Sequence, residues 1–183
     1  MTLRIPRAPG TLSLAVDREL DGSPCPDVRL HAHVGLQAGD DGLRFEARVP
    51  DPEPARVPSA PPGRRVADLW HYDVVECFLV GEGGRYLEVE LSAGGHFLLL
   101  SFDAPRRRVD AHEDARPPLD FQRGAAGWAA AIRLPWEIVP AGLCALNAFV
   151  CARDRFLAYR PLPGGTPDFH QPAHFPPVSL DLG

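Results

Sequence analysis

The chain contains 183 residues, and its 24 acidic and 19 basic side chains give a formal net charge of −5 at neutral pH. This size suits a single domain, 1–183, with a hydrophobic core of its own. An acidic chain has no general electrostatic reason to bind nucleic acid. Every basic residue is arginine, because lysine is absent from the sequence. Mechanisms that need a side-chain amine, such as a Schiff base or a phosphate-loop lysine, are therefore excluded.

No targeting or membrane segment is visible. The first ten residues carry Arg4 and Arg7 but no apolar run of the kind found in a secretory signal. No stretch approaches the roughly 20 apolar residues of a membrane span. The four cysteines are scattered without a Cys-x-x-Cys pair, so we expect reduced thiols. These features predict a cytoplasmic protein that does not associate with membranes.

Short runs of alternating apolar and polar residues dominate the sequence, and Gly, Pro or Asp separates them. This pattern is typical of half-buried β-strands. Residues 135–139, between Pro135 and Pro140, predict a short helix. Together these elements predict an all-β fold, an antiparallel β-sandwich with one or two short helices. The strands are expected over residues 11–18, 28–36, 43–49, 73–80, 86–91, 96–102, 128–134, 148–153 and 156–161.

Residues 50–68 form a long segment without a strand pattern. Six prolines between positions 50 and 62 prevent regular strand pairing. Because strand-like sequence continues on both sides, we expect a loop within the domain, and long loops are often functional. Residues 106–118 form a second irregular, charged segment. Its run Arg106-Arg107-Arg108 is interpreted as a solvated turn, with phosphate binding as the weaker alternative.

Acidic residues recur on two neighbouring predicted strands. Alternation places Asp73 on one side of its strand and Glu76 on the other. On the next strand, Tyr86, Glu88 and Glu90 lie opposite an apolar face, so a hairpin would gather three carboxyl groups on one surface. Clustered carboxyl groups raise one another's pKa and can transfer protons, bind a cation or accept hydrogen bonds from sugar hydroxyls. A water-facing strand side is the alternative for the second strand.

Histidine spacing offers two weak metal hypotheses. His31 and His33 lie two apart on a predicted strand and could chelate zinc, but no third ligand is in register. His170 and His174 have the four-residue spacing of helical zinc motifs. Pro172 prevents that helix, and the glutamate of the helical motif is absent. No zinc hydrolase is predicted.

Two motifs on neighbouring predicted strands stand out, Leu69-Trp70-x-Tyr72-Asp73-Val74-Val75-Glu76-x-Phe78 and Tyr86-Leu87-Glu88-Val89-Glu90-Leu91-x-x-x-Gly95. They resemble the signature of DOMON-like sandwich proteins, which are similar to family 9 carbohydrate-binding modules. Within this group the chain is most similar to a family of small intracellular proteins found from bacteria to vertebrates. The resemblance implies a β-sandwich of jelly-roll type more firmly than it implies an activity. Three further pieces match the family of small intracellular proteins, namely Leu134-Pro135-Trp136, Asn147-Ala148-Phe149 and Pro167-Asp168-Phe169-His170.

Family 9 modules stack the ends of sugar chains on tryptophan and bind their hydroxyls through acids and amides. The resemblance assigns stacking to Trp70 and an acidic contact to Glu76, while Glu88 and Glu90 match paired acids on the next strand. The second stacking tryptophan of these modules is not evident, and the segment around His170 is expected to replace it. Neither haem nor another cofactor is expected.

Two functions remain open for these residues. The first is a non-catalytic binding module for a small polyhydroxylated ligand, such as a sugar or glycoside, with Arg133 or His170 donating hydrogen bonds. The second is an acid–base enzyme of the glycoside hydrolase type that uses Glu76, Glu88 and His170. Structural calcium held by Asp73 with Glu76 and Glu88 is a further hypothesis. The candidate ligand-binding residues are Trp70, Asp73, Glu76, Glu88, Glu90, Arg133, Asp168 and His170.

Overall fold

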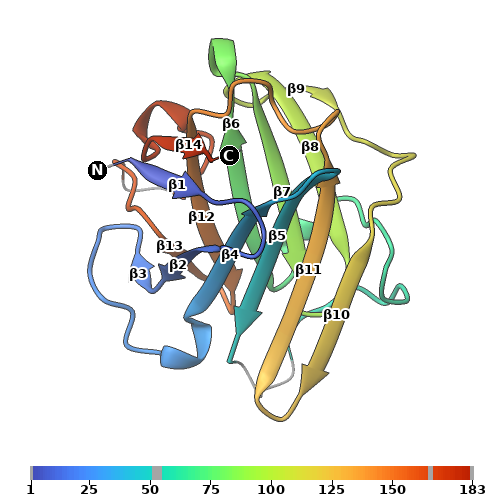
Figure 1. The fold of residues 1–183 in the computed structure, drawn as a ribbon. Coiled ribbons are helices and arrows are strands. Elements are labelled where there is room, and N and C mark those ends of the chain that lie inside the picture. Colours follow the sequence, from blue (N-terminus) through green and yellow to red (C-terminus); the bar gives the residue numbers. More distant parts are fainter. Residues whose placement is uncertain (1, 51–54, 165–166, 182–183) are drawn as a thin grey trace.

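The computed structural model describes residues 2–50, 55–164 and 167–181, and two antiparallel β-sheets dominate it (Figure 1). The five-stranded sheet has the spatial order β10 (Leu119–Gly124), β11 (Gly127–Pro135), β5 (Gly42–Val49), β4 (Ala32–Ala38), β2 (Leu12–Val16). The seven-stranded sheet has the order β3 (Arg18–Glu19), β13 (Arg155–Ala158), β12 (Ala145–Ala152), β6 (Val74–Val80), β7 (Tyr86–Ser92), β8 (Phe97–Ala104), β9 (Arg107–Asp110). Near the chain ends, β1 (Leu3–Ile5) and β14 (Val178–Leu180) pair in parallel.

Side-chain alternation along the central strands divides the apolar residues into two layers. In β7, Leu87, Val89 and Leu91 belong to the core between the two sheets, which also contains the inward residues of β4, β5 and β11. Tyr86, which precedes them in β7, points to the other side and belongs to a second apolar layer on the outer face of the seven-stranded sheet. The central strands are thus covered on both sides, and every residue of β6 and β7 is buried. The predicted β-sandwich is confirmed.

Two irregular segments cover the outer face of the seven-stranded sheet. The predicted loop 50–68 is irregular over its described part, and its residues 51–54 lie outside the described ranges. Arg65 forms a parallel bridge with Phe97, and the ring nitrogen Nε2 of His96 lies 2.8 Å from the carbonyl oxygen of Ala60. From the C-terminal segment, the Phe169 ring stacks on Phe149 of β12 with 4.1 Å between the ring centres. These contacts attach the loop to the start of β8 and the C-terminal segment to β12.

Two predictions about local structure are wrong. No helix forms over 135–139, because Pro135 still pairs with Gly42 in the sheet and a single turn hydrogen bond, Ile138 N–H to Pro135 O, follows it. Residues 106–118 are not wholly irregular, because they contain β9, which pairs with β8. The helices in the described ranges are three-residue 3-10 turns, and none could cross a lipid bilayer. They are η1 (Val28–Leu30), η2 (Leu69–His71), η3 (Glu82–Gly84) and η4 (Pro172–His174).

Candidate functional site

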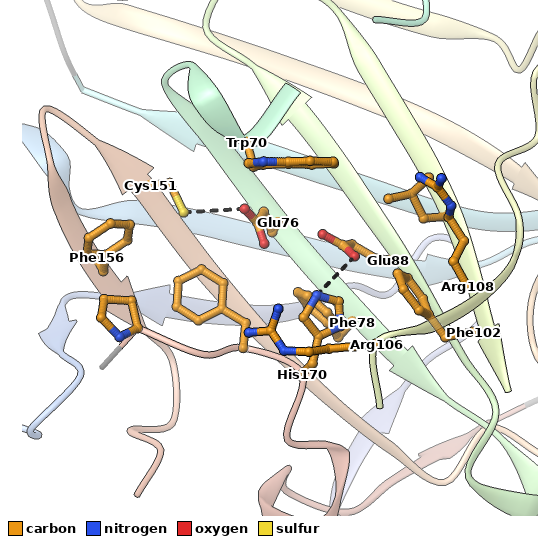
Figure 2. A pocket seen from close by; sticks show the side chains of 13 residues that line it. Trp70, Glu76, Phe78, Glu88, Phe102, Arg106, Arg108, Cys151, Phe156 and His170 are labelled. Carbon is orange, nitrogen blue, oxygen red and sulfur yellow. Dashed lines mark hydrogen bonds and ion pairs between the residues drawn. The ribbon is translucent and has the colours of Figure 1, made fainter. Parts of the chain in front are cut away.

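A pocket of about 500 Å³ opens on the outer face of the seven-stranded sheet (Figure 2). The strands β6, β7, β8 and β12 form its floor, while η2, the β8–β9 turn and the C-terminal segment form its rim. Aromatic and charged side chains therefore meet in one cavity. Its lining consists of Trp70, Glu76, Phe78, Glu88, Leu100, Phe102, Arg106, Arg108, Cys151, Phe156, Pro167, Phe169 and His170.

Strand pairing gathers the three carboxyl groups. In the antiparallel β6–β7 ladder, Glu76 lies opposite Glu90 and Phe78 lies opposite Glu88. Since opposite residues of a ladder point to the same face, all three carboxyl groups project from the outer face of the sheet. Glu76 and Glu88 line the pocket, whereas Glu90 is fully buried beside them and does not line it.

Trp70 reaches the rim because its neighbour anchors the short helix that carries it. Leu69 is fully buried in the outer apolar layer, and its carbonyl oxygen accepts the N–H of Tyr72 at 3.0 Å. The turn starts at Asp68, whose φ of 53° lies in the left-handed region. Trp70 itself remains 37% exposed. Figure 2 shows its ring on the opposite side of the carboxyl groups from His170.

His170 is held by contacts from three directions. The Asp168 carboxylate accepts the backbone N–H of His170 at 3.0 Å and the Arg106 guanidinium at 2.8 Å. The edge of the imidazole packs against Phe78, with 5.5 Å between ring centres, and against Phe102 at 5.0 Å. The C-terminal segment is thereby fixed with the imidazole directed into the pocket. Asp168 acts as a positioning residue in this arrangement.

The hydroxyl of Tyr86 determines which nitrogen of His170 carries the hydrogen. Tyr86 Oη accepts the backbone N–H of Arg106 at 3.0 Å and lies 2.8 Å from His170 Nδ1. Burial, followed by the charge of Arg106, lowers the pKa of His170 to about 4, so the imidazole is neutral at pH 7. Burial raises the pKa of Tyr86 to about 12, so its hydroxyl keeps its hydrogen and donates it to Nδ1. The hydrogen of the imidazole therefore lies on Nε2, 3.9 Å from Glu88 Oε2.

The carboxyl groups carry strongly perturbed acidities. Burial raises the pKa of Glu76 to about 7, against a smaller lowering by the Cys151 thiol, whose Sγ lies 3.3 Å from Oε1. Burial, and then the charge of Glu76, raises the pKa of Glu88 well above its ordinary value. Burial also raises the pKa of Glu90 well above its ordinary value, with the Glu76 and Glu88 charges as the next causes. The three groups therefore hold more protons at neutral pH than free glutamates do.

The structure brings together part of the predicted residue set. Trp70, Glu76, Glu88 and His170 line one pocket. Glu90 is buried on the same face of the sheet without lining the pocket, and Asp168 holds the segment that carries His170.

Asp73 and Arg133 lie elsewhere. Asp73 is directed away from the carboxyl groups, as the alternation predicts, and its carboxylate accepts the backbone N–H of Arg56 at 3.0 Å and of Arg153 at 3.3 Å. Arg133 belongs to β11 of the other sheet, where its guanidinium pairs with Asp41 at 2.8 Å. Arg133, which was expected to donate a hydrogen bond to the ligand, therefore lies on the other sheet and does not line the pocket.

The hypothesis of a calcium site held by Asp73, Glu76 and Glu88 has no geometric basis, because Asp73 lies on the opposite side of the strand. Among the described residues, no group of three His, Cys, Asp or Glu side chains could hold a metal ion. The zinc pair also separates. His33 lies in β4, whereas His31 precedes that strand and its Nε2 lies 3.0 Å from the Cys25 carbonyl oxygen.

Sequence reasoning missed several lining residues. Arg106 and Arg108, interpreted as part of a solvated turn, border the pocket because the β8–β9 hairpin runs along the sheet edge beside it. Cys151 and Phe156 come from β12 and β13, which pair with the central strands. Cys151 lies two residues after Phe149 in β12 and shares its outer layer, but strand alternation does not show which strands lie beside β12.

Comparison with known sequences identifies the family. No protein-family model matches the chain, but individual relatives do. The mouse UPF0462 protein C4orf33 homolog is 33% identical over 161 residues, which cover 81% of this chain and 82% of that protein. The chain belongs to the UPF0462 family. The human member, UPF0462 protein C4orf33, is 32% identical over 172 residues, covering 87% of this chain and 83% of that protein. The predicted similarity to a family with vertebrate members is confirmed.

Solved structures share the architecture of this UPF0462 member. A crystal structure described as a candidate carbohydrate-binding protein from Bacteroides uniformis has a TM-score of 0.70 at 16% identity, covering 98% of this chain and 97% of that one. A family 9 carbohydrate-binding module from Caldicellulosiruptor kristjanssonii, in complex with cellotriose, has a TM-score of 0.58 at 16% identity, with 98% and 93% covered. These matches confirm the predicted resemblance to the family 9 fold.

Proposed function

We propose that this protein is a non-catalytic binding module for a small polyhydroxylated ligand, such as a sugar or glycoside. The observation that carries the proposal is the pocket itself, in which the partly exposed Trp70 ring faces the buried carboxyl groups of Glu76 and Glu88. Its volume of about 500 Å³ falls within the range of small-molecule sites.

Each lining group has a role that matches an amphipathic sugar. The C–H face of a pyranose would stack on Trp70, while Glu76 and Glu88 would exchange hydrogen bonds with its hydroxyls. A protonated carboxyl group both donates and accepts, so raised pKa values suit a neutral polyol. His170 would donate through Nε2. The aromatic walls would exclude water from these hydrogen bonds and so strengthen them.

The structural neighbours support a sugar as the ligand. The family 9 module from C. kristjanssonii was solved in complex with cellotriose and also in complex with glucose, the latter with a TM-score of 0.50 at 18% identity. In this chain the pocket contains a partly exposed aromatic ring, Trp70, and hydrogen-bonding groups. The shared fold and this local chemistry point to the same ligand class.

Isothermal calorimetry with a panel of mono- and disaccharides tests the proposal. Trp70→Ala should weaken binding by about tenfold or more, since it removes an aromatic platform, and Trp70→Phe should retain part of the affinity. The matched control is Arg133→Gln, which removes an arginine on the other sheet and should leave affinity unchanged. If no sugar binds the wild type, or if Trp70→Ala binds as well as the wild type, the proposal is rejected.

A glycoside hydrolase is the second candidate, and the raised pKa of Glu76 favours it. A carboxyl group with a pKa of about 7 can remain protonated at neutral pH and serve as a general acid. Glu88, in the same pocket, would then be the second carboxylate that such hydrolysis needs. Release of nitrophenol from a panel of nitrophenyl glycosides, abolished in Glu76→Gln, would support this candidate. No release from any member of the panel rejects it.

A further inference from the structure

The pocket contains a buried carboxyl oxygen without a hydrogen-bond partner. Glu88 is 4% exposed and lines the cavity, and its Oε2 has no hydrogen-bond partner among the described residues. Both carboxyl oxygens of Glu90, on the same face of the strand, are also buried without a hydrogen-bond partner of ordinary geometry among the described residues. Burying a carboxylate without hydrogen-bond donors costs free energy. Apart from the side-chain interaction between Glu88 and Glu90, the described residues leave the demand of an ionised Glu88 for hydrogen-bond donors unmet. Figure 2 shows Glu88 directed into the space between Trp70 and His170.

The charged groups around Glu88 leave that demand unmet. The Nε2 of His170 lies 3.9 Å from Glu88 Oε2, and this histidine is neutral at pH 7 because burial and the Arg106 charge lower its pKa to about 4. The Arg106 guanidinium pairs with Asp168 at 2.8 Å. Arg108 is exposed to solvent at the rim, where water screens its charge. Burial raises the pKa of Glu88 more than either arginine lowers it.

We infer that the ligand of this pocket carries a protonated amino group, as an amino sugar does, and that this ammonium binds to the Glu76 and Glu88 carboxylates beside the Trp70 ring. The inference rests on the proposed function and specifies its ligand class. A sugar hydroxyl donates one hydrogen bond and leaves the carboxyl groups protonated. An ammonium donates three and compensates the negative charge that burial otherwise disfavours.

The aromatic ring favours the same ligand. An ammonium near the face of a tryptophan is attracted by the ring's negative electron density, and a desolvated site strengthens that attraction. Trp70 is the lining tryptophan, and its partial exposure leaves a face free for a ligand. Phe78 and Phe102 complete an apolar wall around the carboxyl groups. Aromatic faces combined with carboxylates form a recognition set for cationic amines.

Binding of an ammonium exchanges one cation for another. The ligand arrives as R–NH3+, a carboxylic acid of the cluster loses its proton to solvent, and an ammonium–carboxylate pair remains. Charge balances, because one positive charge enters the pocket as one proton leaves. The number of protons released on binding can be measured by calorimetry in two buffers of different ionisation enthalpy. A neutral sugar should release none.

The experiment compares glucosamine with glucose and N-acetylglucosamine on the wild-type protein at pH 7. Glucosamine should bind about tenfold or more tightly than glucose, with net proton release, because a hydrogen bond to a charged group is stronger than a neutral one. N-acetylglucosamine, which keeps the nitrogen but loses the charge, should show no such advantage.

Two variants locate the effect. Glu88→Gln should lose the preference for glucosamine, so that glucosamine and glucose bind this variant with affinities within about threefold of each other, because the amide retains hydrogen bonding but not ionisation. Glu76→Gln provides the same comparison if Glu88→Gln fails to fold, as judged by circular dichroism. Arg133→Gln, on the other sheet, should retain the full preference.

The outcomes separate the inference from the proposed function. If glucose binds as tightly as glucosamine, or if both variants retain the glucosamine preference, the inference is overturned and a neutral sugar-binding module remains. If neither glucose, glucosamine nor any other sugar of the panel binds, the proposed function is overturned together with the inference. Preferential glucosamine binding with proton release, lost in Glu88→Gln, supports both.

Discussion

Replacement of Glu76 by glutamine should change how the stability of the protein depends on pH. Glu76 is 2% exposed, and burial raises its pKa from 4.5 to about 7. The folded protein therefore retains a proton between about pH 4.5 and pH 7 that the unfolded chain has lost. Because the folded state binds more protons in this window, the free energy of unfolding falls as the pH rises through it, and this contribution levels off above the folded-state pKa.

The magnitude follows from the shift. One pKa unit corresponds to 1.36 kcal/mol. A rise of the Glu76 pKa from 4.5 to about 7 therefore makes the contribution of Glu76 to the free energy of unfolding about 3 kcal/mol smaller at pH 8 than at pH 4. Glutamine does not titrate. Glu76→Gln should therefore reduce the decline in stability by about 1.4 kcal/mol per pH unit between pH 5 and pH 7. Part of the decline should remain, because Glu88 and Glu90 also have raised pKa values.

Urea unfolding followed by tryptophan fluorescence at pH 5, 6, 7 and 8 measures this slope. The control is Glu46→Gln on the other sheet. Burial raises the pKa of Glu46, but hydrogen bonds from Arg44 and Arg48 outweigh it, and the net shift is downward. Its stabilising contribution is therefore complete above the ordinary glutamate pKa, and this variant should run parallel to the wild type from pH 5 to pH 8. If Glu76→Gln also runs parallel to the wild type, the argument from burial is refuted.

Three further substitutions test the local structure, each by urea unfolding. Tyr86→Phe removes the hydroxyl that contacts His170 Nδ1 at 2.8 Å, so stability should fall by about 1 kcal/mol; an unchanged value would contradict the assigned hydrogen bond. Phe169→Ala removes a ring stacked on Phe149, so the free energy of unfolding should fall by at least about 1 kcal/mol and ligand binding should weaken. Unchanged stability would show that the C-terminal segment does not depend on this contact. Gly95→Ala should lower the free energy of unfolding by more than about 1 kcal/mol, because the φ of Gly95 is 76° and an added Cβ would lie 2.6 Å from the Phe121 ring. Gly124→Ala is the control: an added Cβ there meets open space, so this variant should cost clearly less.

Much of the site follows from local pattern. The alternation in β6 and β7 placed Glu76, Glu88 and Glu90 on one face. The short turn between the two strands made an antiparallel hairpin of β6 and β7 the simplest arrangement. The proline content of residues 50–68 indicated a loop ending at Trp70. These inferences hold because a strand alternates its side chains with a period of two, and a hairpin joins neighbours in sequence.

The remaining placements depended on contacts distant in sequence. Arg133 and Glu76 have similar strand contexts, yet the fold assigns them to different sheets and gives Arg133 a partner, Asp41, 92 residues earlier. Arg106, in the β8–β9 turn, pairs with Asp168, 62 residues later, because the C-terminal segment returns to the same side of the sheet.

The sequence by itself determined the sandwich class, the faces of the central strands and the presence of an acidic and aromatic surface. The tertiary structure alone decided which of these groups share a cavity and which are buried without partners. The physical reason is that alternation is set by neighbouring residues, whereas burial, and with it the raised pKa values of the three glutamates, depends on every segment that covers them.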